Sequence, residues 1–142
     1  MIKDVNIIPL KLLPNEKGRL MEVQRRDDSH FLGFGQVYIT SSRPGVVKAW
    51  YRHKQQTDQI AAISGLFKLV LFDGNEVMQI TMGELAPKLV QFPPGVWHGF
   101  QNIGDKESFL LHLNSEPFNF ESPDEERIDT KSTSIPYTWP DL

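Results

Sequence analysis

Two short stretches of the sequence hold the side chains best suited to chemistry. Tyr51 and His53 are separated by a single residue, and Asp58 lies five residues after His53. His98 comes after a Pro-Pro-Gly turn. Side chains two apart on a strand point to the same face, so Tyr51 and His53 are expected to enter one interior. Imidazole and carboxylate groups can move protons near neutral pH. We therefore predict one polar cluster of these residues, with Lys48 as a further candidate.

Short strands are predicted to position this cluster. Runs of β-branched and aromatic residues alternate with turn signals, which is typical of a sandwich or barrel. The helical candidate is a single turn over Asp124–Ile128. Trp50 and Arg52 are expected to face outward or into a subunit interface. The expected strands cover 2–13 (broken at Pro9), 19–23, 35–40, 46–50, 59–63, 66–72, 76–82, 88–92 and 109–114, with His98 on one more.

The whole chain, residues 1–142, is predicted to form a single all-β domain. Residues 117–142 are polar and rich in proline, and we expect them to wrap the domain as a C-terminal tail that ends in Ile135–Trp139. No linker or internal repeat marks a second domain.

Composition excludes several classes of function. The net charge is −3, no basic patch is present, and nucleic acid is therefore not an expected partner. The chain has no cysteine, which excludes disulfides and thiolate chemistry. It lacks both a long apolar run and a signal peptide, so we expect a soluble cytoplasmic protein without a membrane partner.

The spacing of both stretches resembles the two motifs of the cupin superfamily. Gly45, Tyr51, His53, Asp58 and Gly65 match the first motif, with Tyr for its first His and Asp for its Glu. The second motif is matched by Pro93, Gly95, His98 and Asn102, with Pro87 in place of its first Gly. The resemblance implies a double-stranded β-helix, or jelly-roll, barrel. It also implies an alternative in which His53, Asp58 and His98 hold a divalent metal such as iron, manganese or zinc.

A narrower resemblance covers nearly the whole chain. Its segments are Lys17–Glu22, Gln36–Tyr38, Gly45–Tyr51, Pro93–Phe100 and the Trp-Pro ending. In this order they resemble the dTDP-4-dehydrorhamnose 3,5-epimerases and their relatives. The resemblance implies metal-free proton transfer beside the ketone of a nucleotide-linked 4-keto-6-deoxy sugar. In that chemistry a His held by an Asp is the base, a Lys steadies the enolate, and a Tyr returns a proton from the other face.

The chain departs from that family at the catalytic positions. Tyr51 stands at the position of the base, Asp58 near that of the Lys, and Leu111 near that of the Tyr. The motif of the related 3,4-ketoisomerases is matched roughly at Lys48, and at His53 and Lys54. We assign Tyr51, His53 and His98 as catalytic candidates. The substrate-binding candidates are Lys17, Glu22, Gln36, Lys48, Asp58 and His112.

Structural or solvent-exposed roles are expected for several other polar residues. His30 lies in a charged loop and is expected to be solvated, and 124–126 to form a solvated acidic face. His112 lies in an apolar strand, on the same face as Leu110, as either a core or a supporting residue.

Three functions remain open at this stage. They are an epimerase or ketoisomerase without a cofactor, an inactive relative that binds a nucleotide sugar, and a metal-dependent cupin enzyme. The first implies a homodimer in which N-terminal strands are exchanged. Lys17 and Glu22 would then reach the partner's site.

Overall fold

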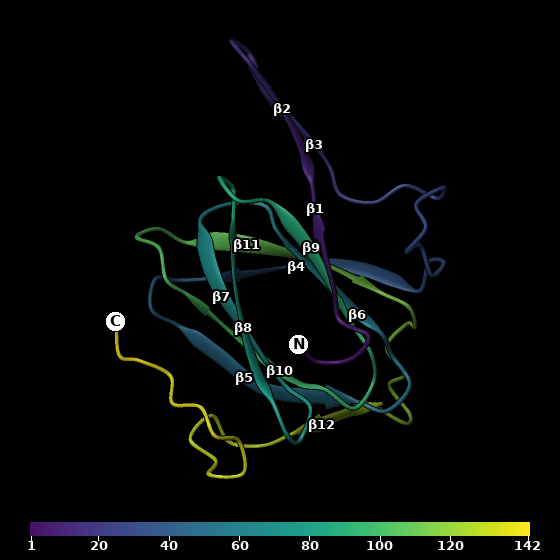
Figure 1. Ribbon diagram of the computed structural model, residues 1–142, viewed down its shortest axis with the longest axis vertical. Coiled ribbons are helices and arrows are strands. Elements are labelled where there is room, and N and C mark those ends of the chain that lie inside the picture. Colours follow the sequence, from purple (N-terminus) through teal and green to yellow (C-terminus); the bar gives the residue numbers. More distant parts are fainter.

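Two antiparallel sheets of five strands each form a barrel, as expected for an all-β chain (Figure 1). The computed structural model describes residues 1–142. The first sheet has the spatial order β1 (Asn6–Pro9), β9 (Lys88–Phe92), β6 (Asp58–Ala62), β11 (Ser108–Asn114), β4 (Gln36–Ser42). The second sheet has the order β12 (Glu125–Arg127), β5 (Val47–His53), β10 (Trp97–Asn102), β7 (Leu66–Phe72), β8 (Val77–Gly83).

The apolar core fills only part of the space between the sheets. Alternate residues of the central strands point inward, and together with Ile2, Val5 and Val96 from outside the strands they form one buried cluster of 14 residues. Phe67, Leu69 and Leu71 of β7 meet Ile60 and Val90 of the first sheet there. The inward positions of β4, β5 and β11 include polar residues instead.

A bulge in β5 sets which side chains enter this polar region. His98 pairs with Tyr51, but the next residue of β10, Gly99, pairs with Ala49, so Trp50 is an extra residue. A bulge of this kind shifts the alternation of side chains by one. Lys48 and Tyr51 therefore share the inward face, although simple alternation would place them on opposite faces.

The C-terminal tail covers the outer face of the second sheet. Trp50 points outward, as expected, but it is fully buried because Ile135, Tyr137 and Trp139 of the tail pack around it and Val70. Arg52 stays near the surface, where its guanidinium lies over the ring of Trp97. In Figure 1 the tail runs along the outside of the barrel.

The helical turn predicted at Asp124–Ile128 is wrong. Residues 125–127 instead form β12, which pairs with β5, and mutual backbone hydrogen bonds of 3.2 Å join Ile128 to Trp50. A lone helical turn makes few internal hydrogen bonds. The exposed edge of β5 offers this segment more backbone partners.

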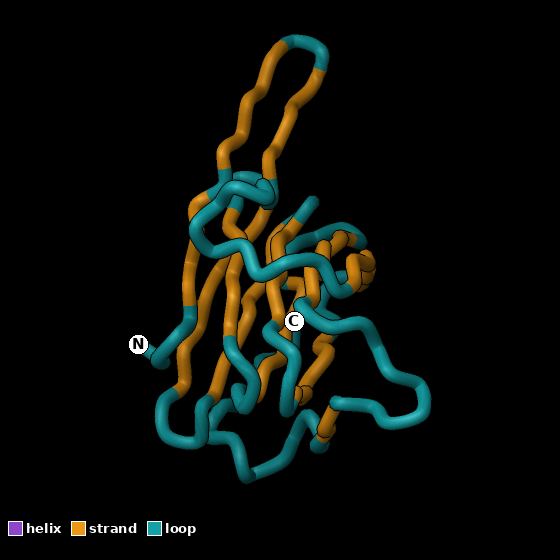
Figure 2. Tube along the Cα trace, turned by 90° about the vertical axis from the view of Figure 1, so that its right-hand side faces the viewer, coloured by secondary structure: helices purple, strands orange, loops and turns teal.

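The strands β2 (Lys11–Asn15) and β3 (Gly18–Glu22) form a hairpin that projects away from the barrel (Figures 1 and 2). Its turn lies at 16–17. Leu13 and Leu20, which pair across the hairpin, are about half exposed. The preceding strand, β1, pairs with β9 of its own chain.

The structure contains no helix of the length and apolar character needed to cross a membrane. The cytoplasmic location expected from the sequence stays a prediction.

Candidate active site

A cavity of about 200 Å³ lies in the polar part of the barrel, between the two sheets. It contains the predicted cluster: Lys48, Tyr51, His53, Asp58 and His98 all line it. The other lining residues are Tyr38, Thr40, Ile60, Phe100, His112, Glu125 and Arg127.

Asp58 is at the centre of the cluster. Its two carboxylate oxygens lie 3.7 Å from His53 Nε2 and 3.9 Å from His98 Nε2. Burial raises the pKa of Asp58 to about 6, against the lowering effects of His53 and of a hydrogen bond from Gln56. No ion pair joins Asp58 to Lys54 or Arg52; Arg52 instead pairs with Glu126 at 2.7 Å.

His98 is a buried neutral imidazole. Burial lowers its pKa to about 4. Its Nδ1 lies 3.4 Å from the carbonyl oxygen of Val96, which can only accept, so this contact favours the tautomer with the proton on Nδ1. Nε2 then presents a lone pair toward Asp58. The ring stacks near His53, with centroids 5.7 Å apart.

His53 lies between two carboxylates. Besides Asp58, its Nδ1 is 3.8 Å from Asp124 Oδ2. Both distances exceed that of a hydrogen bond, and the buried Nδ1 has no partner. The two carboxylates can stabilise positive charge that develops on this ring during a reaction. His53 is thus arranged to take up a proton. We name the second-sheet residues Tyr51, His53 and His98 the histidine wall.

Residues of the first sheet form the facing side, which we name the tyrosine wall: Tyr38, Thr40 and His112. Tyr38 and His112 pair across β4 and β11, and their rings stack at 4.6 Å and 12°. Thr40 Oγ1 hydrogen bonds to His112 Nε2 at 2.8 Å. Burial lowers the pKa of His112 to about 3 and raises that of Tyr38. Sequence reasoning selected His112 but missed Tyr38 and Thr40, although they alternate on one predicted strand.

Two cations line the cavity. Lys48 donates from Nζ to the carbonyl oxygen of Ser41 at 2.6 Å. Arg127, which sequence reasoning also missed, lies over the Tyr51 ring at 5.4 Å and pairs with Glu125. Lys48 can therefore place a positive charge beside a bound polar group.

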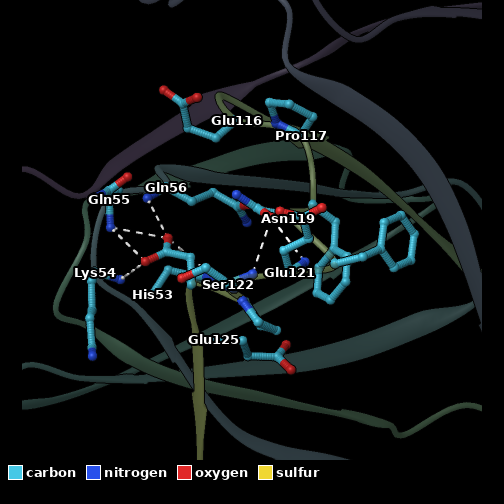
Figure 3. Close-up of a pocket in the computed structure, with 14 residues that line it drawn as sticks. His53, Lys54, Gln55, Gln56, Glu116, Pro117, Asn119, Glu121, Ser122 and Glu125 are labelled. Carbon is cyan, nitrogen blue, oxygen red and sulfur yellow. Dashed lines mark hydrogen bonds and ion pairs between the residues drawn. The ribbon is translucent and has the colours of Figure 1, made fainter.

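A wider pocket of about 730 Å³ adjoins the cavity, since His53 and Glu125 line both. Figure 3 shows Lys54, Gln55 and Gln56 on one side of it and Glu116, Pro117 and Asn119 on the other. Asp124 accepts backbone hydrogen bonds from Lys54, Gln55 and Gln56. The prediction of a solvated acidic face is therefore wrong at this residue, because Asp124 holds the turn after β5.

The remaining predicted residues lie outside the cavity of this chain. Lys17 is at the tip of the hairpin, Glu22 is at its base within reach of Arg25, and Gln36 accepts a hydrogen bond from the amide of Phe118. His30 is not solvated as predicted: its ring is largely buried beside Asp28, because the 23–34 segment packs on the first sheet through Gln24–Gln59 and Gln91–His30 hydrogen bonds.

Together, the jelly-roll barrel and its interior imidazole–carboxylate cluster define a cupin. Comparison with known sequences gives the family: the chain belongs to the family described as the polysaccharide biosynthesis C-terminal domain, whose model matches residues 14–126.

Curated relatives support this placement. A Haloferax volcanii protein described as the probable low-salt glycan biosynthesis epimerase Agl13 is 33% identical over 136 residues, which cover 89% of this chain and 87% of the relative. The spore coat polysaccharide biosynthesis protein SpsL of Bacillus subtilis is 30% identical over 146 residues, covering 98% of this chain and 97% of the relative.

A solved structure has nearly the same fold. The dTDP sugar isomerase from Desulfovibrio desulfuricans G20 aligns with a TM-score of 0.92 at 29% identity, covering 97% of this chain and 92% of that one. The jelly-roll fold predicted from the two motifs is confirmed.

Proposed function

We propose that the chain is an isomerase or epimerase of a nucleotide-linked 4-keto-6-deoxy sugar, with dTDP as the carrier. The observation that carries this proposal is the cavity in which His53, flanked by two carboxylates, faces a free interior beside Lys48. The Haloferax relative is described as an epimerase and the Desulfovibrio protein as a dTDP sugar isomerase, which supports the same chemistry.

The proposed reaction is a proton transfer next to a ketone. A carbonyl acidifies the neighbouring C–H bond, and His53 takes the proton while the electron pair moves to the carbonyl oxygen. Asp58 and Asp124 stabilise the imidazolium, and Lys48 stabilises the enolate oxygen. His98 is kept neutral by burial, so its Nε2 can accept a hydrogen bond from the substrate.

The first test is an NMR assay with a dTDP-linked 4-keto-6-deoxyhexose in deuterated water. Deuterium at C3, C5 or both is the expected result, and the labelled carbon identifies the site of proton transfer. Line broadening of the ligand without exchange would contradict catalysis and indicate a binding protein. Tyr51→His then tests whether the family's usual base restores exchange.

A second candidate is a metal-dependent reaction at the same site. One ligand atom each from His53, Asp58 and His98 lies within 4.8 Å of the others. Two imidazoles and a carboxylate are a suitable donor set for zinc, iron or manganese. These residues would hold the ion, which would polarise the ketone. Elemental analysis of the purified protein and assays with a chelator separate the candidates, because the metal-free reaction retains its rate without bound metal.

We further propose a homodimer in which an N-terminal hairpin reaches the partner. An isolated two-stranded hairpin has little stability of its own, and this one exposes Leu13 and Leu20. Because β1 pairs within its own chain, the strands available for exchange are β2 and β3. Lys17 would then approach the site of the other subunit.

Light scattering tests this arrangement. The full chain is expected to have the mass of two chains, and Leu13→Lys together with Leu20→Lys should shift it toward one. A monomeric wild type would contradict the proposal.

A further inference from the structure

Inversion at a carbon needs two groups on opposite sides of the substrate. The proton leaves from one face, and another must arrive at the other face. The histidine wall belongs entirely to the second sheet, on β5 and β10. A group on the first sheet is therefore needed to complete an epimerase, and this inference rests on the function proposed above.

We propose that Tyr38 is the general acid that returns the proton from the tyrosine wall. It lines the cavity from β4, in the sheet that faces His53. Tyr38 lies outside both cupin motifs of the sequence.

The surroundings of Tyr38 suit that role. Its ring is held flat against His112, which is itself fixed by the hydrogen bond to Thr40. His112 is buried and uncharged near neutral pH, so it supports the ring without adding a competing charge. Burial raises the pKa of Tyr38, so its hydroxyl carries its proton near neutral pH. The residue is still 40% exposed, so solvent can replace the proton.

The other tyrosines do not meet the requirement. The chain has three tyrosines in all. Tyr51 is next but one to His53 on β5 and projects from the same wall. Tyr137 packs against Trp50 and Trp139 on the outside of the second sheet.

His53 removes the proton of the C–H bond, and that electron pair forms the carbon–carbon double bond of the enolate while the carbonyl π pair moves to oxygen. The enolate collapses, its carbon takes the hydroxyl proton of Tyr38 on the opposite face, and the tyrosinate accepts a proton from water. His53 returns its own proton to solvent, so no other reactant is consumed.

The test compares three Tyr→Phe variants in deuterated water with a dTDP-linked 4-keto-6-deoxyhexose. Two rates are measured by NMR: deuterium entry into recovered substrate of unchanged configuration, and formation of the inverted product. In Tyr38→Phe, inversion is expected to fall at least about 10²-fold, the contribution typical of a general acid. Exchange with retention, which needs only His53, should change less than about threefold. The phenylalanine ring keeps the stacking on His112, so folding should be preserved.

Tyr137→Phe is the matched control and should leave both rates unchanged, while Tyr51→Phe should alter both rates together. Equal loss of both rates in Tyr38→Phe, or loss of neither, would overturn the proposal. Wild-type exchange without any inversion would also overturn it, yet would leave proton transfer by His53 standing. A wild type that shows no exchange removes the proposed function and this inference together.

Discussion

The interior of the barrel has two halves of different character. In one half, Leu69, Leu71 and Met82 are fully buried in a continuous apolar cluster. In the other, the inward positions of β4, β5 and β11 carry hydroxyl, amine and imidazole groups around a cavity. Asp58 and His98 lie at the boundary: Ile60 of the apolar cluster is two residues after Asp58 on β6, and the ring of Phe92 lies 4.8 Å from that of His98.

The contrast shows that the residues that stabilise the barrel and the residues suited to chemistry occupy different regions of its interior. The apolar half removes hydrocarbon surface from water and contributes most of the favourable free energy of folding. The polar half buries groups that would prefer water, which shifts their pKa values and costs stability. Substitutions in the two halves are therefore expected to change different measured quantities.

The largest effect is expected from His53→Ala, in the polar half. Loss of the base should lower the rate of deuterium exchange by about 10²–10⁴-fold. The side chain is near the mouth rather than in the apolar cluster, so the thermal unfolding temperature should stay close to that of the wild type. His98→Ala should likewise lower the exchange rate. Exchange at the wild-type rate in His53→Ala would show that another group is the base.

In the apolar half, Leu69→Ala should act on stability instead. Removing a fully buried leucine side chain typically lowers the free energy of unfolding by about 2–5 kcal/mol. Urea denaturation measures this loss. The exchange rate per folded molecule should stay within a fewfold of the wild type, and a large drop would mean that the two halves are mechanically coupled.

The pH dependence of the free energy of unfolding should report how much stability is lost by burying titratable groups in the polar half. The folded pKa of His112 is lowered to about 3, below the usual value of 6.5, because the ring is buried. The unfolded chain then binds more protons between these values, so stability falls as the pH drops below about 6.5. Between pH 6.5 and 4.5 this one residue should account for a loss of about 2–3 kcal/mol.

His112→Gln isolates this contribution, because the substitution removes the titrating group but keeps a polar side chain for Thr40. The variant should lose less stability than the wild type over the same pH range in urea denaturation, with His98 responsible for much of the remaining loss. Parallel pH curves for the two proteins would contradict the assignment.

The smallest effect is expected from Asp124→Asn, at the mouth. The amide keeps one acceptor oxygen for the 54–56 turn but removes the charge facing His53. Stability should fall by about 0.5–2 kcal/mol, as for the loss of a side-chain cap. The exchange rate should fall about tenfold or less, measured in the same NMR assay. Asp129→Asn, away from the cavity, serves as the control.

Sequence alone predicted the strands and the centre of the site well. Period-two alternation and turn residues are local signals, and they placed β7 and β9 at their observed bounds. The spacing of the two motifs also selected His53, Asp58 and His98, which the structure brings together. The segment around Asp124 was misassigned because its strand exists only by pairing with the distant β5.

The sequence by itself therefore determined the all-β barrel and the two motifs that carry the imidazole and carboxylate groups. Both can be recognised from short-range patterns of residues. Tertiary structure alone decided that a bulge turns Lys48 inward, that Tyr38 and His112 face the histidine wall, and that the tail buries Trp50. The physical reason is that register, bulges and cross-sheet contacts depend on partners far apart in the chain, whose relative positions are set only when the barrel closes.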